Sequence, residues 1–174
     1  VGSEMCIRDS CKELFENHDE RPTNSFLYSL VMDTYSFGYS SSGFTDMPMN
    51  HKVFLAQFDA IKKLASEGPC VMVGRCADYA LSEYKDCFSV FVHADTDWRI
   101  NRLSQKHNKT AKEAKDMINK TDKSRSSYYN YYTNKKWGAA SSYNLCVDSS
   151  KLGIDGAAKA IIQAIEIFDS IKNK

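Results

Sequence analysis

The chain has 174 residues, of which 43% are hydrophobic and 26% charged, and its formal net charge at pH 7 is +1. This length predicts one globular domain with its own core, and the near-neutral charge argues against a general affinity for nucleic acid or anionic membranes. No apolar run approaches the roughly 20 residues that cross a bilayer, and no secretory signal peptide is recognisable. The six cysteines form no CxxC pair, which argues against a zinc ribbon and is typical of a reducing, cytoplasmic setting.

The first fifty residues carry few periodic signals. Residues 1–10 begin without methionine and show no period, so we interpret them as a non-native leader that takes no part in the fold. Residues 11–20 and the segment after Pro22 are predicted to be helical. Residues 35–49 are rich in Ser, Gly and aromatic side chains, which predicts a loop of the kind that often forms a functional flap.

A helix is expected over residues 50–67, because apolar side chains recur there at helical spacing and Gly68 and Pro69 follow. The expected apolar stripe consists of Phe54, Phe58, Ile61, Leu64 and Ala65.

The next stretch is a short β-branched run, residues 70–73, that Gly74 interrupts. It predicts a buried strand, a tight turn and a short helix over residues 77–84. Open parallel sheets bind ligands at the carboxyl ends of their strands, and Arg75 stands there, with Asp78 three residues on. A guanidinium suits a phosphate, because its planar fork donates two parallel hydrogen bonds. The alternative is a surface arginine after a core strand, and this stretch alone does not decide between the two.

Residues 87–94 are largely apolar and predict a strand that is covered on both faces. A helix over residues 96–107 follows, and Arg99, Arg102 and Lys106 share one of its faces. A cationic face just after the carboxyl end of a strand is suited to neutralise transferring phosphates. An ordinary solvated helix face is the alternative.

A longer helix is expected to begin after Thr110, its N-cap, and it contains the motif Asp122-x-x-Arg125. The two side chains are neighbours on a helix, so they can pair and hold the guanidinium in the fixed pose that a transition-state clamp needs. The same pair could be an exposed helix ion pair worth about 0.3–0.5 kcal/mol. Lys123 adds positive charge beside them.

Tyrosines crowd residues 128–132, and Trp137 follows them. Aromatic side chains beside a basic helix can stack nucleic acid bases, but packing is the interpretation that we favour. No metal-binding spacing such as HExxH and no GxSxG nucleophile motif occurs in the chain.

The chain ends with a predicted strand over residues 145–147 and a helix over residues 154–171. The side chains expected to face the core are Ile154, Ala158, Ile161, Ile162, Ile165 and Phe168. Strands that alternate with helices predict an α/β fold, a parallel sheet flanked by helices with right-handed crossovers. Three strands are few for such a sheet, so we expect a partner strand before Cys11.

Three segments resemble the cytidylate kinase-like family of nucleoside monophosphate kinases, and together the resemblance covers about residues 11 to 171. Residues 71–79 (VMVGRCADY) are similar to the family's strand and Gly-Arg turn. Residues 91–103 (FVHADTDWRINRL) are similar to its strand and arginine-bearing lid, and residues 122–138 (DKSRSSYYNYYTNKKWG) to its Asp-x-x-Arg segment. The resemblance implies a P-loop NTPase fold, one domain over residues 11–174, with a helical lid at about 96–138.

The resemblance also implies a reaction, the transfer of the ATP γ-phosphate to a nucleoside monophosphate such as CMP or dCMP, with Mg²⁺. Arg75 would contact the monophosphate of the acceptor, and Asp78 would belong to the same substrate site. The substrates would be the only implied partners, since a membrane and nucleic acid are not expected.

On the lid, Arg99 and Arg102 would close over the donor phosphates. Arg125 would lie against the phosphates, and Asp122 would orient it or touch the substrate. The lysines that would add phosphate contacts are Lys106 and Lys123.

The chain departs from the family at one point. Such kinases begin with a strand and a Gly-rich P-loop, whereas no GxxxxGK(S/T) occurs here. We therefore interpret the chain as truncated at its N-terminus and expect no useful phosphoryl transfer from it. Two other functions stay open: a nucleotide-binding module without catalysis, and a single-stranded nucleic-acid binder that uses residues 109–123 and the tyrosines. The acceptor base and the oligomeric state are not determined by the sequence.

Overall fold

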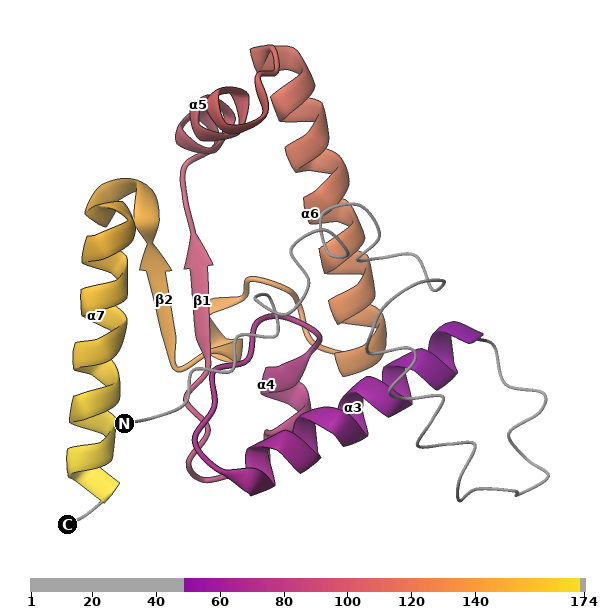
Figure 1. The fold of residues 1–174 in the computed structure, drawn as a ribbon, viewed down its shortest axis with the longest axis vertical. Coiled ribbons are helices and arrows are strands. Elements are labelled where there is room, and N and C mark those ends of the chain that lie inside the picture. Colours follow the sequence, from indigo (N-terminus) through magenta and orange to yellow (C-terminus); the bar gives the residue numbers. More distant parts are fainter. Residues whose placement is uncertain (1–48, 173–174) are drawn as a thin grey trace. The chain divides into compact units, whose positions relative to one another are not determined.

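A computed structural model describes residues 49–172, with side chains from residue 53 onward (Figure 1). These residues divide into two compact units, with the boundary between Lys85 and Asp86. The leader, the early helices, the loop before Met49 and the strand expected before Cys11 all lie outside the described residues. None of the described helices is both long enough and apolar enough to span a membrane.

The first unit contains α3 (Met49–Glu67) and the short α4 (Ala77–Ala80). The helix expected over residues 50–67 is confirmed, and its stripe packs on α4. The ring of Phe58 lies 6.0 Å from that of Phe54 and 6.1 Å from that of Tyr79, measured between centroids. Phe54 and Ile61 are buried, so the apolar stripe forms the core of this unit.

The strand predicted over residues 70–73 is wrong for the described structure. Val71 and Val73 are 61% and 63% exposed, and no described residue pairs with this segment. A strand exists through the hydrogen bonds of a neighbour, and the two described strands pair with each other. The helix expected over residues 77–84 is also shorter, because α4 ends at Ala80 and turns follow it.

The second unit is built on a parallel pair of strands, β1 (Val90–His93) and β2 (Leu145–Asp148). Val90 lies opposite Leu145, and His93 lies opposite Asp148. The parallel α/β arrangement and the strand near residues 145–147 are confirmed. Only two of the three expected strands occur in the described residues, and β1 is shorter than residues 87–94. It is not covered on both faces, because Val92 is exposed.

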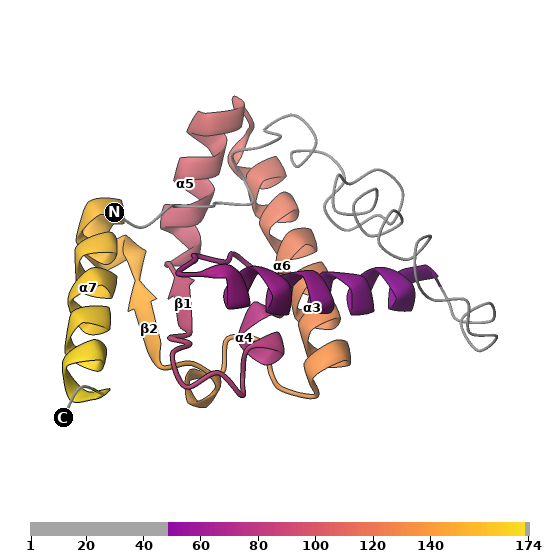
Figure 2. The same ribbon diagram turned by 60° about the horizontal axis from the view of Figure 1, so that its bottom comes forward.

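Helix α7 (Ser149–Lys172) runs beside β2 in both views (Figures 1 and 2). It begins earlier than predicted, and Gly153 interrupts its helical geometry with φ 69° and ψ 176°. Much of the predicted core face is exposed, because two strands about 4.8 Å apart cover only part of a wide apolar stripe. The expected core residues that prove exposed are Ile154, Ala158, Ile162 and Ile165. Phe168 does pack inward, with its ring 5.2 Å from that of Phe88.

A helical hairpin, α5 (Thr96–His107) and α6 (Ala111–Thr133), connects the two strands. Both helices begin where the sequence predicts. Thr110 and Glu113 form a capping box: Thr110 Oγ1 accepts from the Glu113 N–H at 3.3 Å, and Glu113 Oε2 accepts from the Thr110 N–H at 2.8 Å. This box satisfies two amide groups that the first turn of a helix otherwise leaves unpaired.

The loop after α6 returns to β1 through aromatic contacts. The rings of Trp137 and Tyr143 lie 5.4 Å and 5.0 Å from that of Phe91. Gly138 has φ 74°, and a Cβ added there would meet the Phe91 ring at 3.1 Å. The loop therefore needs glycine at this position for two reasons, backbone conformation and close approach.

The capping box predicts a pH dependence of stability. Hydrogen bonds from Thr110 lower the pKa of the Glu113 carboxyl below its ordinary value of 4.5. A carboxyl with a lowered folded pKa stabilises the fold above its unfolded pKa, and this stabilisation is lost as the pH falls through the folded value. Urea unfolding at pH 7 and pH 3 should therefore show a smaller loss of unfolding free energy in Glu113→Gln than in the unchanged chain. Thr110→Ser keeps the hydroxyl and should behave as the unchanged chain. An equal acid loss in Glu113→Gln would contradict this expectation.

The Gly138 contact gives a second prediction. Gly138→Ala should destabilise the chain by more than the cost of about 1–2 kcal/mol for placing a side chain at positive φ, because its Cβ also displaces the Phe91 ring. Gly74→Ala is the matched control, since Gly74 has φ 73° and nothing within 4 Å of an added Cβ. Thermal melts of both variants measure the difference, and equal melting temperatures would show that the contact is unimportant.

Candidate functional site

The first candidate site is the turn that precedes α4. Three consecutive residues, Gly74, Arg75 and Cys76, have positive φ angles of 73°, 57° and 55°. The Ala77 N–H donates to the Gly74 carbonyl at 3.1 Å and closes the turn. Non-glycine residues in this conformation are strained, and such strain persists only where the surroundings hold it, often at binding sites.

Cys76 supplies part of that hold because its side chain is buried. The pKa of the Cys76 thiol is raised to about 12, mainly by burial and also by the nearby Asp78 carboxylate, while Arg75 opposes both effects. The thiol is therefore protonated at neutral pH. It acts as an apolar anchor of the turn and not as a nucleophile.

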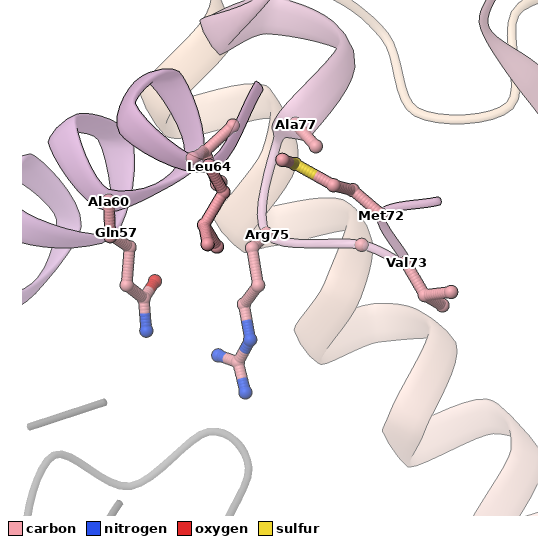
Figure 3. Close-up of a pocket in the computed structure, with 9 residues that line it drawn as sticks. Gln57, Ala60, Leu64, Met72, Val73, Arg75 and Ala77 are labelled. Carbon is pink, nitrogen blue, oxygen red and sulfur yellow. The ribbon is translucent and has the colours of Figure 1, made fainter. Parts of the chain in front are cut away.

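Arg75 lines a small pocket between α3 and this turn, with a cavity volume of about 20 Å³ (Figure 3). Its walls are mostly apolar, and only Gln57 and Arg75 bring polar side-chain ends to it. The apolar side chains of the wall are Ala60, Ile61, Leu64, Met72, Val73 and Ala77. Asp78 is not among the lining residues and sits in the first turn of α4.

Sequence reasoning missed Gln57. A signal existed, because Gln57 falls three residues after Phe54 and four before Ile61, on the stripe that is otherwise apolar. A polar residue at a core position of an amphipathic helix departs from the pattern, and this departure could have identified it.

The second candidate site is the α5–α6 hairpin. Arg99 donates from both terminal nitrogens to Asp122, at 2.7 Å to Oδ2 and 2.8 Å to Oδ1. The hydrogen bonds that Arg99 donates to Asp122 raise the pKa of the Arg99 guanidinium. The motif suggested that Asp122 pairs with Arg125. In the structure Asp122 pairs with Arg99, because the guanidinium from the neighbouring helix engages both carboxylate oxygens.

The other predicted cations are on the surface. Arg102 lies over the Trp98 ring, 5.3 Å from its centroid, and Arg125 is exposed one turn beyond Asp122. Lys106 and Lys123 are exposed as well. The cations of α5 that were expected to act together therefore have different contacts. Arg99 joins α5 to α6, and Arg102 stacks on Trp98 of its own helix.

Residues 96–138 carry much more positive charge than the net charge of the whole chain indicates. They contain eleven Lys and Arg and four Asp and Glu, a net of +7, in a chain whose net charge is +1. A surface of one sign raises the local concentration of oppositely charged ligands. The hairpin and the loop that follows it are therefore suited to an anionic ligand.

The tyrosine run is part packing and part surface. Tyr129 is buried, whereas Tyr131 is 74% exposed and its ring meets Tyr132 edge-on at 4.9 Å. The packing interpretation holds for Tyr129, and Tyr131 stands open to a ligand.

The carboxyl ends of β1 and β2 are joined by polar side chains. Asp148 Oδ1 accepts from the Ser150 N–H at 2.9 Å and from its hydroxyl, which lowers the pKa of Asp148. Lys151 pairs with Asp95 at 2.9 Å. In residues 49–172, no group of three or more His, Cys, Asp or Glu side chains is placed to hold a metal ion.

Comparison with known proteins gives a family. The sequence model described as the cytidylate kinase-like family matches residues 7–151. A solved structure of an uncharacterized protein from Eubacterium ventriosum ATCC 27560 is 34% identical, with a TM-score of 0.64, over 67% of this chain and 74% of that one. No protein with curated annotation matches the chain.

The Arg99–Asp122 pair predicts a measurable coupling. A double-mutant cycle of Arg99→Ala and Asp122→Ala should give about 1 kcal/mol in urea unfolding, because the pair is bidentate and its side chains are only 32% and 28% exposed. The pair of Lys151 and Asp95 is the matched control. It is far more exposed and makes one contact, so its coupling should be smaller. An equal or larger coupling there would contradict a special role for Arg99 and Asp122.

Proposed function

Because the chain belongs to the cytidylate kinase-like family, we propose that it serves phosphoryl transfer from ATP to a nucleoside monophosphate such as CMP or dCMP. The observation that carries the proposal is the placement of Arg75 on a strained turn, at the edge of a largely apolar pocket. A guanidinium matches a phosphate, because its planar fork donates two parallel hydrogen bonds.

Arg75 takes the monophosphate of the acceptor in this proposal. The positive φ angles of Gly74, Arg75 and Cys76 set the direction in which the Arg75 side chain leaves the backbone. Asp78, in the first turn of α4 and three residues after Arg75, belongs to the same acceptor site in this proposal.

In this proposal the α5–α6 hairpin is the lid that closes over the donor phosphates. Arg99 is a positioning residue, because its terminal nitrogens are engaged by Asp122. The exposed Arg102 and Arg125 donate to the phosphates, and Lys106 and Lys123 add to the positive field. Phosphoryl transfer depends mainly on such positioning and charge neutralisation.

The family implies ATP and Mg²⁺, and the residues present in this chain provide only part of what would bind them. The hairpin offers cations to phosphates, but the 174 residues contain no GxxxxGK(S/T), and the described part shows no cluster of metal ligands. Proteins commonly hold Mg²⁺ through one or two carboxylates together with substrate phosphates and water. These residues therefore support binding of the acceptor better than a complete donor site.

A second function has two observations in its favour. The net charge of +7 over residues 96–138, together with the exposed ring of Tyr131, suits a single-stranded nucleic acid, which combines phosphates with stackable bases. Such binding would weaken steeply with added salt.

Equilibrium binding of CMP to the chain tests the proposal. Arg75→Ala should weaken CMP about 10- to 100-fold, because a charged hydrogen-bonded contact to phosphate is lost. Lys63→Ala, on the exposed side of α3, is the matched control and should not change the affinity. Equal CMP affinity in Arg75→Ala and the unchanged chain would contradict the proposal. Tighter, salt-sensitive binding of an oligothymidine than of CMP would favour the second function.

Turnover gives a separate prediction. A coupled assay of ADP release with ATP, Mg²⁺ and CMP or dCMP should show no useful rate from this 174-residue chain, because a P-loop lysine that holds the donor phosphates is missing from it. Rapid turnover would contradict the need for a P-loop. A chain extended with a P-loop that turned over no acceptor would contradict the kinase proposal.

A further inference from the structure

Helix α7 has apolar side chains on more of its circumference than the strands of its own unit cover. Beyond Gly153 the helix is regular. The side that packs on the strands contains the buried Ala157 and the half-buried Ile161, Ala164 and Phe168, which share one helical face. Figures 1 and 2 show β2 running beside α7, and no other described helix of this unit runs beside it in either view. The remaining sides of α7 are therefore available to a partner.

A second apolar row, the α7 stripe, consists of Ile154, Ala158, Ile162 and Ile165. Their spacing places them on one face of the helix, roughly a quarter-turn around from the packed side. The three isoleucines are 54%, 56% and 37% exposed, and Ala158 is exposed as well. Soluble proteins seldom leave a contiguous row of large apolar side chains in water unless it serves an interaction. The α7 stripe is therefore a candidate interface.

The charges beside the α7 stripe indicate which partner fits it. Lys159 and Glu166 are exposed and lie seven residues apart, so they stand two turns apart on the same border of the stripe, away from the strands. The middle of this pair falls beside Ile162, the centre of the stripe. A second copy packed antiparallel around that point by two-fold symmetry places Lys159 against the partner's Glu166, and Glu166 against the partner's Lys159. The stripe is thus complementary to itself in both shape and charge.

Two aspartates near the ends of the α7 stripe work against this register only weakly. The register turns Asp155 toward the partner's Asp169, and the two carboxylates repel. Each lies seven residues from the midpoint of the pair, twice as far as Lys159 and Glu166 do. Because packed helices cross at an angle, they diverge away from the crossing point, and solvent screens charges at the ends of the contact. The Lys–Glu pairs are therefore the closest charges of the interface.

We propose that the α7 stripe is the interface of a homodimer. Two copies pack their α7 helices antiparallel about a two-fold axis at Ile162, and Lys159 of each copy pairs with the partner's Glu166. The proposal goes beyond the proposed function and does not depend on it, because none of these residues takes part in phosphate binding. A single pair of helices buries less surface than a standard interface of about 1,600 Å², so we expect a dissociation constant of about 10–100 μM.

Sedimentation equilibrium of the full 174-residue chain over a range of concentrations tests the proposal. Ile162→Glu brings two carboxylates together at the two-fold axis, in apolar surroundings, and should raise the dissociation constant about 100-fold or more. Ile167→Glu is the matched control. Ile167 is 61% exposed on the same helix, but it follows Ile162 by five residues and points to nearly the opposite side from the stripe. This control should leave the dissociation constant unchanged.

A charge exchange tests the antiparallel register. Lys159→Glu alone and Glu166→Lys alone each place like charges opposite one another twice, and each should weaken the dimer about tenfold. The double variant exchanges the two charges and should restore the dissociation constant of the unchanged chain. Restoration by a second substitution cannot result from loss of folding, and thermal melts of each variant accompany the measurement.

Three results would overturn the proposal. The first is an unchanged chain that stays monomeric up to about 1 mM, and the second is a dimer that Ile162→Glu and Ile167→Glu weaken equally. The third is a double variant of Lys159 and Glu166 that dimerises no more tightly than the single variants.

Discussion

The left-handed turn from Gly74 to Cys76 is the constraint on which the candidate site depends. Positive φ at three successive residues is unfavourable for side chains with a Cβ, and the buried Cys76 and the hydrogen bond that closes the turn hold it in place. This strained backbone sets the direction in which the Arg75 side chain leaves the turn, beside a small pocket of mostly apolar walls.

The hairpin of the second unit is organised by a different device, charge pairing between helices. Arg99 and Asp122 use two parallel hydrogen bonds, and the capping box at Thr110 fixes the start of α6. At the other end, Trp137 and Tyr143 attach the following loop to β1. Helix α6 is thereby held at both ends, while Arg102 and Arg125 stay on the surface. The hairpin therefore combines an ion pair between its helices with exposed cations on its surface.

Local patterns in the sequence predicted local structure. The helices α3, α5 and α6 were found because periodicity and caps act within a few residues. The strand predicted over residues 70–73 was wrong because a strand depends on a neighbour to pair with. The predicted core face of α7 was wrong because an amphipathic pattern shows which residues are suited to burial, and not which of them another element covers. The partner of Asp122 was missed for the same reason, since Arg99 approaches from another helix. Gln57 could be recognised in the sequence as a polar residue on the otherwise apolar stripe of α3, but its place on the pocket wall is known only from the structure.

The most direct test of the account is an experimental structure of the chain with CMP bound. The account predicts the phosphate of CMP within hydrogen-bond distance of the Arg75 guanidinium, with the turn from Gly74 to Cys76 unchanged. A phosphate bound elsewhere, with the pocket beside Arg75 empty, would contradict it.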